Sequence, residues 1–171
     1  MPRSTQDDAR CTVFTFKEGL LSAIAHDLEI AVERFTIERD EGKLEARFEP
    51  QSLRVRHPMK DGVPNPSALS DRDKRKIEST IQDDVLETRK HPEIRFTSTE
   101  VKVDGDTATI RGTLALHGRT KELQLRARKE GPKWIAETTL HQPDFGITPY
   151  TAMMGTLRIK PDVRVRIELP A

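Results

Sequence analysis

The chain has 171 residues, a length typical of one domain that can bury roughly 70% of the surface it exposes when unfolded. Lys and Arg number 29 against 28 Asp and Glu, and no long block of one sign occurs, so we expect no nucleic-acid partner. Cys11 is the only cysteine, which excludes an internal disulfide and a cysteine-rich metal cage, and no apolar run approaches the ~20 residues of an integral membrane segment.

Residues 1–10 are polar, and no apolar segment of the kind found in secretory signals follows them. We therefore expect residues 1–171 to form a single domain, with 1–10 as a flexible leader. The expected location is the cytoplasm, or the periplasm if an export signal has been removed.

The first third of the chain predicts strands separated by apolar or proline-containing breaks. Residues 12–16 alternate as a short strand that places Phe14 and Phe16 on one side. Residues 20–25 form a compact apolar turn, which we interpret as one short helix. Residues 27–37 return to strand character with Leu28 and Ile30 alternating, and a change of phase indicates a bulge or bend near residues 33–34.

A turn at residues 40–42 precedes a clean period-2 segment over 43–48. Residues 57–69 contain three prolines and one glycine, which predicts a loop. Ser70 and Asp73 then form a capping-box pattern, and Ile77, Ile81 and Val85 recur every four residues. This stripe predicts a helix that packs on the outside of the sheet or across one mouth, with a break near residues 83–84.

The remainder reads as antiparallel sheet. Strands are expected over 94–103, 106–116, 122–128 and 134–141, joined by short turns, and a final strand over 156–169 follows an irregular crossing at 143–155. The total is about eight strands and one interrupted helix. We therefore predict an all-β fold with a minor helix, namely an eight-stranded antiparallel β-barrel, because closing the sheet removes its exposed edges.

Several motifs in this order resemble the YceI-like family of polyisoprenoid-binding, lipocalin-like barrel proteins. They are a charged helix over 71–85, a His-Pro step into a strand over 91–99, the hairpin sequence of residues 110–121, and the segment 144–147 ahead of Gly155. The resemblance covers roughly residues 71–169. It implies a barrel whose lumen accepts a long apolar tail, and it implies a possible homodimer. The chain departs from the family pattern at residues 20–27, where a histidine-containing strand is usual.

Function depends on whether the barrel is filled, since eight strands leave either a packed interior or room for one small ligand. Small residues expected to face inward (Ala46, Ala108, Gly112, Ala127 and Ala136) favour unfilled volume. We predict binding, sequestration or carriage of an apolar or amphiphilic molecule of isoprenoid, quinone or fatty-acyl type, without cofactor or catalysis. The candidate ligand-binding residues are Phe14, Phe16, Leu28, Ile30, Phe48, Phe96, Leu114, Leu116, Trp134, Phe145, Tyr150, Met153 and Met154. Tyr150, Met153 and Met154 would form a lid, or would merely plug the barrel end.

Two alternatives stay open. Every candidate residue also fits ordinary core, in which case the protein is a filled structural or interaction module. An enzyme would need a histidine facing the lumen, but the five histidines (His26, His57, His91, His117 and His141) have no metal-ligand spacing. His26 and Asp27 are adjacent, and adjacent strand residues point to opposite faces, so they do not form a base with an orienting carboxylate. We therefore predict no catalytic residue, and the histidine spacing predicts no metal site. A ligand head group could meet His26, Arg119, Lys121 or Tyr150.

Overall fold

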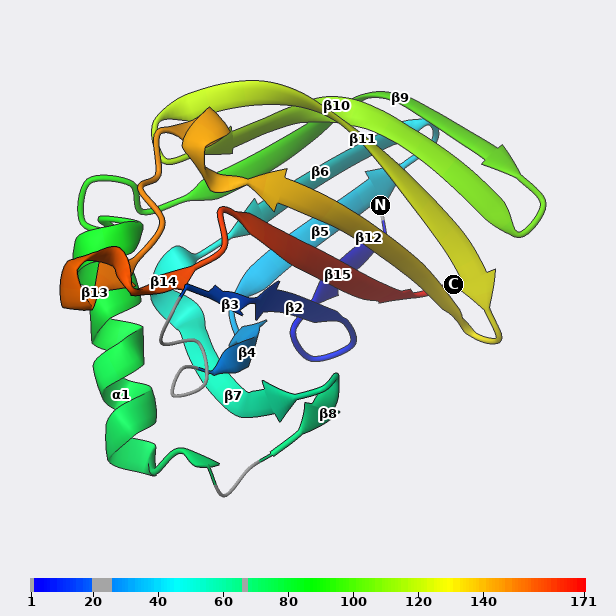
Figure 1. Ribbon diagram of the computed structural model, residues 1–171. Helices are drawn as coiled ribbons and strands as arrows, with labels where there is room; N and C mark the ends of the chain where they lie inside the picture. The colour runs from blue at the N-terminus through cyan, green and yellow to red at the C-terminus, as the bar shows by residue number, and fades with distance from the viewer. Residues whose placement is uncertain (1, 20–25, 66–67) are drawn as a thin grey trace.

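The computed structural model describes residues 2–19, 26–65 and 68–171 (Figure 1). Its strands are β1 (Arg3–Thr5), β2 (Arg10–Thr15), β3 (Lys17–Glu18), β4 (Asp27–Val32), β5 (Phe35–Asp40), β6 (Lys43–Phe48), β7 (Leu53–Lys60), β8 (Val63–Pro64), β9 (Ile94–Asp104), β10 (Thr107–Leu116), β11 (Arg119–Glu130), β12 (Lys133–His141), β13 (Thr151–Ala152), β14 (Leu157–Ile159) and β15 (Asp162–Pro170). The helical elements are α1 (Asp71–Thr80), the π-turn η4 (Ile81–Val85) and the 3₁₀ turns η2 (Pro50–Ser52), η5 (Gln142–Phe145) and η6 (Met153–Gly155).

Among the described residues, twelve strands form one antiparallel sheet in the order β1-β5-β6-β9-β10-β11-β12-β15-β2-β4-β7-β8. The sheet curls so strongly that β9, β10 and β11 arch over one side while β2, β4 and β7 lie on the other (Figure 1). A smaller sheet, β13-β14-β3, lies at the end of the molecule next to α1. The architecture is therefore all-β with one short helix, as the sequence predicts, and has the form of a half-barrel.

A corner joins the two flanks of this sheet. The connection at Glu33 and Arg34 carries the chain from β4 to β5, and η2 carries it back from β6 to β7. The two connections lie side by side, because Glu33 N donates to Ser52 O at 3.2 Å and Glu49 N donates to Arg34 O at 3.0 Å. The phase change expected near residues 33–34 is thus a corner at which the chain passes to the other flank, so β4 and β5 are separate strands.

Most of the second half agrees with the sequence pattern. β9, β10, β11 and β12 form consecutive hairpins, and their turns contain glycines at positive φ: Gly105, Gly118 and Gly131. Within β9–β10 the register shifts between Arg111 and Gly112, which marks a β-bulge. The irregular crossing predicted at 143–155 contains η5, β13 and η6.

Three expectations are wrong. The count of eight strands is too low, because the pattern merged β4 with β5 and missed several short strands. Residues 57–69 are not all loop: β7 continues to Lys60 and pairs with β8, because Pro58 and Pro64 occupy ladder positions near a sheet edge, where a missing N–H is tolerated. Of the expected flexible leader, the structure describes residues 2–10, and these are held in place, since β1 pairs with β5 and buries Ser4.

The helix lies across one end of the curled sheet, in agreement with one of the two predicted placements (Figure 1). Ser70 accepts a hydrogen bond from Asp73 N at 3.1 Å, and Ser70 N donates to the Asp73 carboxylate at 3.3 Å, which completes the capping box. Glu78 Oε2 accepts from Val55 N at 2.9 Å, and Gln82 donates to Pro50 O at 2.8 Å. The break expected near residues 83–84 is not present, because α1 continues without interruption into the π-turn η4, which ends at Val85.

Candidate ligand-binding cavity

The curled sheet and α1 border a partly open cavity of about 740 Å³. Side chains therefore do not fill the interior, whereas the alternative of a structural module requires a filled one. Most of the long strands contribute alternate residues to its wall, as the two-residue period of a strand dictates, whereas β7 contributes Leu53 alone. On β12, for example, Trp134, Ala136, Thr138 and Leu140 line the cavity.

The wall is almost entirely aliphatic and aromatic. Its apolar residues include Val13, Val32, Ile37, Ala46, Leu53, Val85, Leu86, Ile94, Val101, Val103, Ala108, Ile110, Leu123, Leu125, Ala127, Ile147, Val163, Val165, Ile167 and Leu169. The small residues Ala46, Ala108, Ala127 and Ala136 leave part of the interior open. A void of this composition offers hydrocarbon a dry environment and offers few partners to a polar molecule.

Gly112 contributes to the wall indirectly. A Cβ atom added to Gly112 would lie 2.6 Å from Cζ of Phe96, and it would also collide with Thr97 O on the neighbouring strand β9. The absence of a side chain at the β-bulge therefore leaves space for the ring of Phe96, which is buried and lines the cavity.

The helix closes one end of the cavity with its apolar stripe. Ile77, Ile81 and Val85 all line the cavity and pack against the core. Polar groups gather at the same end: Lys76 and Thr80 from the helix, His26 ahead of β4, Tyr150, and Arg158 on β14. Arg158 Nε lies 3.0 Å from Glu18 Oε1, so part of its charge is already paired.

The opposite end is formed by strand turns. Arg39, Asp40 and Lys43 line it at the β5–β6 hairpin, and Val103, 64% exposed, lines it on β9. Arg39 Nη1 donates to Pro170 O at 3.0 Å, while Arg39 Nε is buried without a hydrogen-bond partner among the described residues. Asp40 is the one carboxylate among the described lining residues, so cations outnumber anions around the cavity.

Nine of the thirteen residues named from the sequence line this cavity: Leu28, Ile30, Phe48, Phe96, Leu114, Leu116, Trp134, Phe145 and Tyr150. Their position is settled by the structure, and their contact with a ligand stays a proposal. Phe145 is almost wholly buried, whereas Tyr150 is 40% exposed and lies at the rim.

Two of the others face away from the cavity. Cys11, Val13 and Thr15 are the residues of β2 that line it, so Phe14 lies on the outer face, opposite Arg164 of β15. The ring of Phe16 lies 5.8 Å from the Arg164 guanidinium carbon on that outer side. The alternation along residues 11–16 correctly indicated a strand, but the inward face that we inferred from it is wrong, because Cys11, Val13 and Thr15 line the cavity and Phe16 packs against Arg164 outside it.

Met154, one of the two methionines expected in a lid, does not lie over the cavity. Met154 is fully exposed at a positive φ of 58°, outside the cavity wall, and Met153 lies in η6. The expected helix over residues 20–25 lies outside the described residues. The helix α1 covers the end of the cavity near Tyr150. The apolar residues that recur every four positions along α1 and η4 were the sequence signal for this cover.

The residues named as head-group contacts divide evenly. His26 and Tyr150 line the cavity, whereas Arg119 and Lys121, on β11, do not. Lys76 and Arg158 also line the cavity but were not predicted, because their positions depend on how α1 and β14 are placed in the folded chain. His57, His91, His117 and His141 lie outside the wall, so His26 is the histidine that an enzyme in this cavity would use. Its neighbour Asp27 accepts from Lys17 N at 2.7 Å.

Cys11 lies on the cavity wall with 5% of its surface exposed. Burial raises the pKa of its thiol to about 12 from the ordinary 9.0, because a thiolate would be stripped of water there. The group is therefore a small neutral hydrophobe at physiological pH.

Within the described residues, no helix is both long enough and apolar enough to span a bilayer.

Comparison with solved structures gives the same fold over nearly the whole chain. The structure of BcnA from Burkholderia cenocepacia matches with a TM-score of 0.65 and 12% identity, covering 95% of this chain and 96% of that one. A structure described as a polyisoprenoid-binding domain from Saccharophagus degradans matches with a TM-score of 0.58 and 14% identity, covering 99% and 98%. At these identities the likeness establishes the fold alone.

Sequence comparison identifies the family. A UPF0312 protein of Pectobacterium atrosepticum is 44% identical over 73 residues, which are 37% of this chain and 38% of that protein. Protein YceI of Escherichia coli is 50% identical over 48 residues, 28% of this chain and 25% of that protein. These matches span well under half of the curated relatives. The profile of the YceI-like domain, however, matches residues 7–171, and the chain therefore belongs to the YceI-like family.

Proposed function

We propose that this protein binds an elongated apolar or amphiphilic molecule, of the isoprenoid, quinone or fatty-acyl class, in the cavity of the curled sheet. The observation that carries the proposal is the 740 Å³ void with an aliphatic and aromatic wall. Its volume lies in the range of about 300–1,000 Å³ that small-molecule sites occupy. An interior meant only for stability would be packed near crystal density instead.

The binding energy would come from hydrocarbon burial. Each methylene that leaves water for the cavity contributes about 0.8 kcal/mol, or close to fourfold in affinity. A chain of about ten carbons would thereby offset the entropy lost on binding and retain useful affinity. The wall offers few polar partners, so the ligand would be selected by shape and length rather than by hydrogen bonds along its tail.

The polar end of the ligand would lie at the helix end of the cavity. Lys76, Arg158, His26 and Tyr150 provide two permanent cations and two hydrogen-bonding groups there. Lys76 makes no ion pair with any described residue, whereas Arg158 is paired with Glu18. This arrangement favours an acidic or strongly polar head group near Lys76.

The family relationship supports the ligand class. A structural relative from Saccharophagus degradans is described as a polyisoprenoid-binding domain, and its fold matches over nearly the whole of both chains. The physiological role that follows is carriage or sequestration, in which the protein keeps an insoluble molecule dispersed.

A chain-length series tests this proposal. The full chain is freed of bound lipid and titrated with saturated fatty acids of eight to eighteen carbons, and with farnesol and geranylgeraniol, by calorimetry. We expect one site whose affinity rises about fourfold per methylene and then levels off when the cavity is full. Affinity that does not depend on chain length, or no binding of any of these probes, would overturn the proposal.

A further inference from the structure

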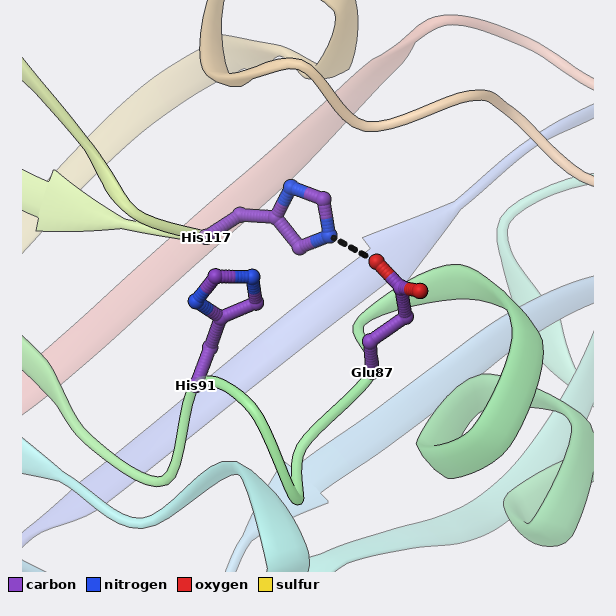
Figure 2. Close-up of side chains that lie close together, drawn as sticks. All are labelled: Glu87, His91 and His117. Atoms are coloured by element: carbon purple, nitrogen blue, oxygen red, sulfur yellow. Dashed lines mark ion pairs between the residues drawn. The ribbon is translucent and has the colours of Figure 1, made fainter.

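Three side chains that could hold a metal ion converge outside the cavity (Figure 2). They are Glu87 and His91, from the segment between η4 and β9, and His117, from the turn between β10 and β11. One ligand atom from each residue lies within 4.8 Å of the others. The sequence predicted no metal ligands, because His117 is far along the chain from the other two and only the fold brings them together.

His117 is oriented as metal-bound histidines usually are. Its Nδ1 lies 3.2 Å from the carbonyl oxygen of Phe145, and a carbonyl can only accept, so Nδ1 carries the proton. In the neutral ring Nε2 is then an unprotonated acceptor. A backbone carbonyl at one ring nitrogen is the outer contact that fixes the tautomer of a metal-binding histidine.

The free nitrogen of His117 points at a carboxylate. Nε2 lies 3.2 Å from Glu87 Oε2, as the dashed line in Figure 2 shows. The side chain is 12% exposed, and Nε2 itself is buried without an aligned hydrogen bond from any described residue. Two acceptors that face each other at this distance repel unless a cation lies between or beside them, so the arrangement calls for a proton or a metal ion.

His91 completes the group from the other side. Its ring centroid lies 4.5 Å from that of His117, with the ring planes tilted by 49°. Gly118 provides room for this ring, because a Cβ atom at Gly118 would lie 3.0 Å from His91 Cε1. His91 is half-buried, so its ring can turn by the small amount that coordination needs.

Glu87 is held in an unusual conformation with one oxygen available. Its φ is 47°, in the left-handed region that a residue with a Cβ seldom adopts. Lys90 Nζ lies 3.2 Å from Oε1, which leaves Oε2 turned toward His117. The hydrogen bond and the charge of Lys90 lower the pKa of Glu87, so its carboxylate is ionised at neutral pH, as a metal ligand must be.

We propose that Glu87, His91 and His117 bind a divalent transition-metal ion of the Zn²⁺ type. Two imidazoles and one carboxylate are a common ligand set for Zn²⁺, and a water molecule would take the fourth position. Tetrahedral ligands of Zn²⁺ lie about 3.4 Å apart, given bond lengths near 2.1 Å. The observed spread of up to 4.8 Å needs side-chain rotations rather than a change of backbone.

The ion would tie the cover of the cavity to the sheet. Leu86 and Leu116 are the immediate neighbours of two of the ligands, and Phe145 provides the carbonyl that orients His117. All three line the cavity near the helix. A metal ion here would join the segment after α1 to the β10–β11 turn and restrict opening of that end. The site does not depend on the proposed ligand and can be tested on the empty protein.

Cobalt binding tests this site directly. The full chain is treated with chelator and titrated with Co²⁺, whose visible absorption is intense in tetrahedral coordination, and Zn²⁺ is then added in competition. We expect one equivalent of Co²⁺ with a tetrahedral spectrum, displacement by Zn²⁺, and a higher unfolding temperature with Zn²⁺.

Variants separate this cluster from ordinary surface histidines. Glu87→Gln and His91→Gln should each weaken Co²⁺ affinity by roughly tenfold or more and remove the thermal shift. His141→Gln is the matched control, since His141 Nδ1 lies 2.6 Å from Asp162 at an exposed site away from the cluster, and it should bind as the natural chain does. No stoichiometric Co²⁺ binding, or equal affinity in all three variants, would show that the cluster is a metal-free ion pair and overturn the proposal.

Discussion

Gly112 lies directly against the ring of Phe96, with no space for even a methyl group between the two strands that carry them. Phe96 is one of the larger side chains of the cavity wall, and its position depends on the missing Cβ at the β-bulge. The shape of the cavity is thus set partly by a residue that contributes no side chain to it.

Replacing Gly112 with Ala should therefore disturb both stability and binding. The added methyl must push Phe96 into the cavity or separate β9 from β10, and overpacking of this kind costs typically 1–3 kcal/mol. Urea unfolding and fatty-acid titration measure the two effects. Arg111→Ala, at the exposed neighbouring position, is the control and should change neither. An unchanged midpoint and unchanged affinity in Gly112→Ala would contradict the tight contact.

Filling the cavity from its wall should weaken ligand binding without unfolding the protein. Ala136 lines the cavity on β12, and a Phe there would occupy space that the ligand tail needs. If two methylenes are displaced, affinity falls by more than about tenfold, at about 0.8 kcal/mol for each. Thr139→Phe adds the same ring on the exposed face of the same strand and should bind normally. Equal affinities in the two variants would place the ligand elsewhere.

The positive charge of Lys76, at the helix end of the cavity, should make the protein prefer a ligand with an acidic head group over one with a neutral head group. Lys76 lines the cavity, so Lys76→Gln should weaken binding of a fatty acid by roughly two- to fivefold while leaving the matching fatty alcohol unaffected, because an exposed ion pair contributes at most about 1 kcal/mol. The difference should shrink in high salt, which screens exposed charges. Lys74→Gln, on the same helix but outside the wall, provides the comparison. A head group at the opposite end would leave both variants indistinguishable.

Cys11 should make the protein less stable in alkali. Burial raises its folded-state pKa to about 12, while the unfolded thiol ionises near 9.0. Above that lower value the unfolded chain has lost a proton that the folded chain retains, so the free energy of unfolding falls as pH rises, by at most about 1.4 kcal/mol per unit. Urea unfolding between pH 8 and 11 measures the slope. Cys11→Ala should show a shallower slope, and identical slopes would mean that the thiol ionises freely in the folded state.

The parts of the fold that sequence could predict are those with local signals. Three such features are encoded by residues close together in the sequence, and all three are present. They are the capping box at Ser70 and Asp73, the apolar stripe from Ile77 to Val85, and the glycine turns of the last hairpins. Period-2 alternation also located most inward-facing residues after position 27, such as Leu114 and Trp134.

What failed depended on distant partners. Alternation over residues 11–16 does not say which face is inside, and the aromatic residues proved to lie outside, where Arg164 packs on Phe16. The prolines at 58 and 64 broke the strand signal, although the edge of the sheet accepts them. Spacing alone also could not bring Glu87, His91 and His117 together, because the β10–β11 turn meets the end of the helical segment only in the folded chain.

The most direct test of the account is to ask what the cavity holds. The purified full chain is extracted with organic solvent, and the extract is analysed by mass spectrometry against a Thr139→Phe preparation and an Ala136→Phe preparation. We predict close to one equivalent of a molecule with a single long apolar chain in the natural chain and in Thr139→Phe, and much less in Ala136→Phe. Absence of such a molecule from all three, together with no uptake of palmitate or geranylgeraniol by the extracted protein after refolding, would contradict the claim that the cavity is a binding site.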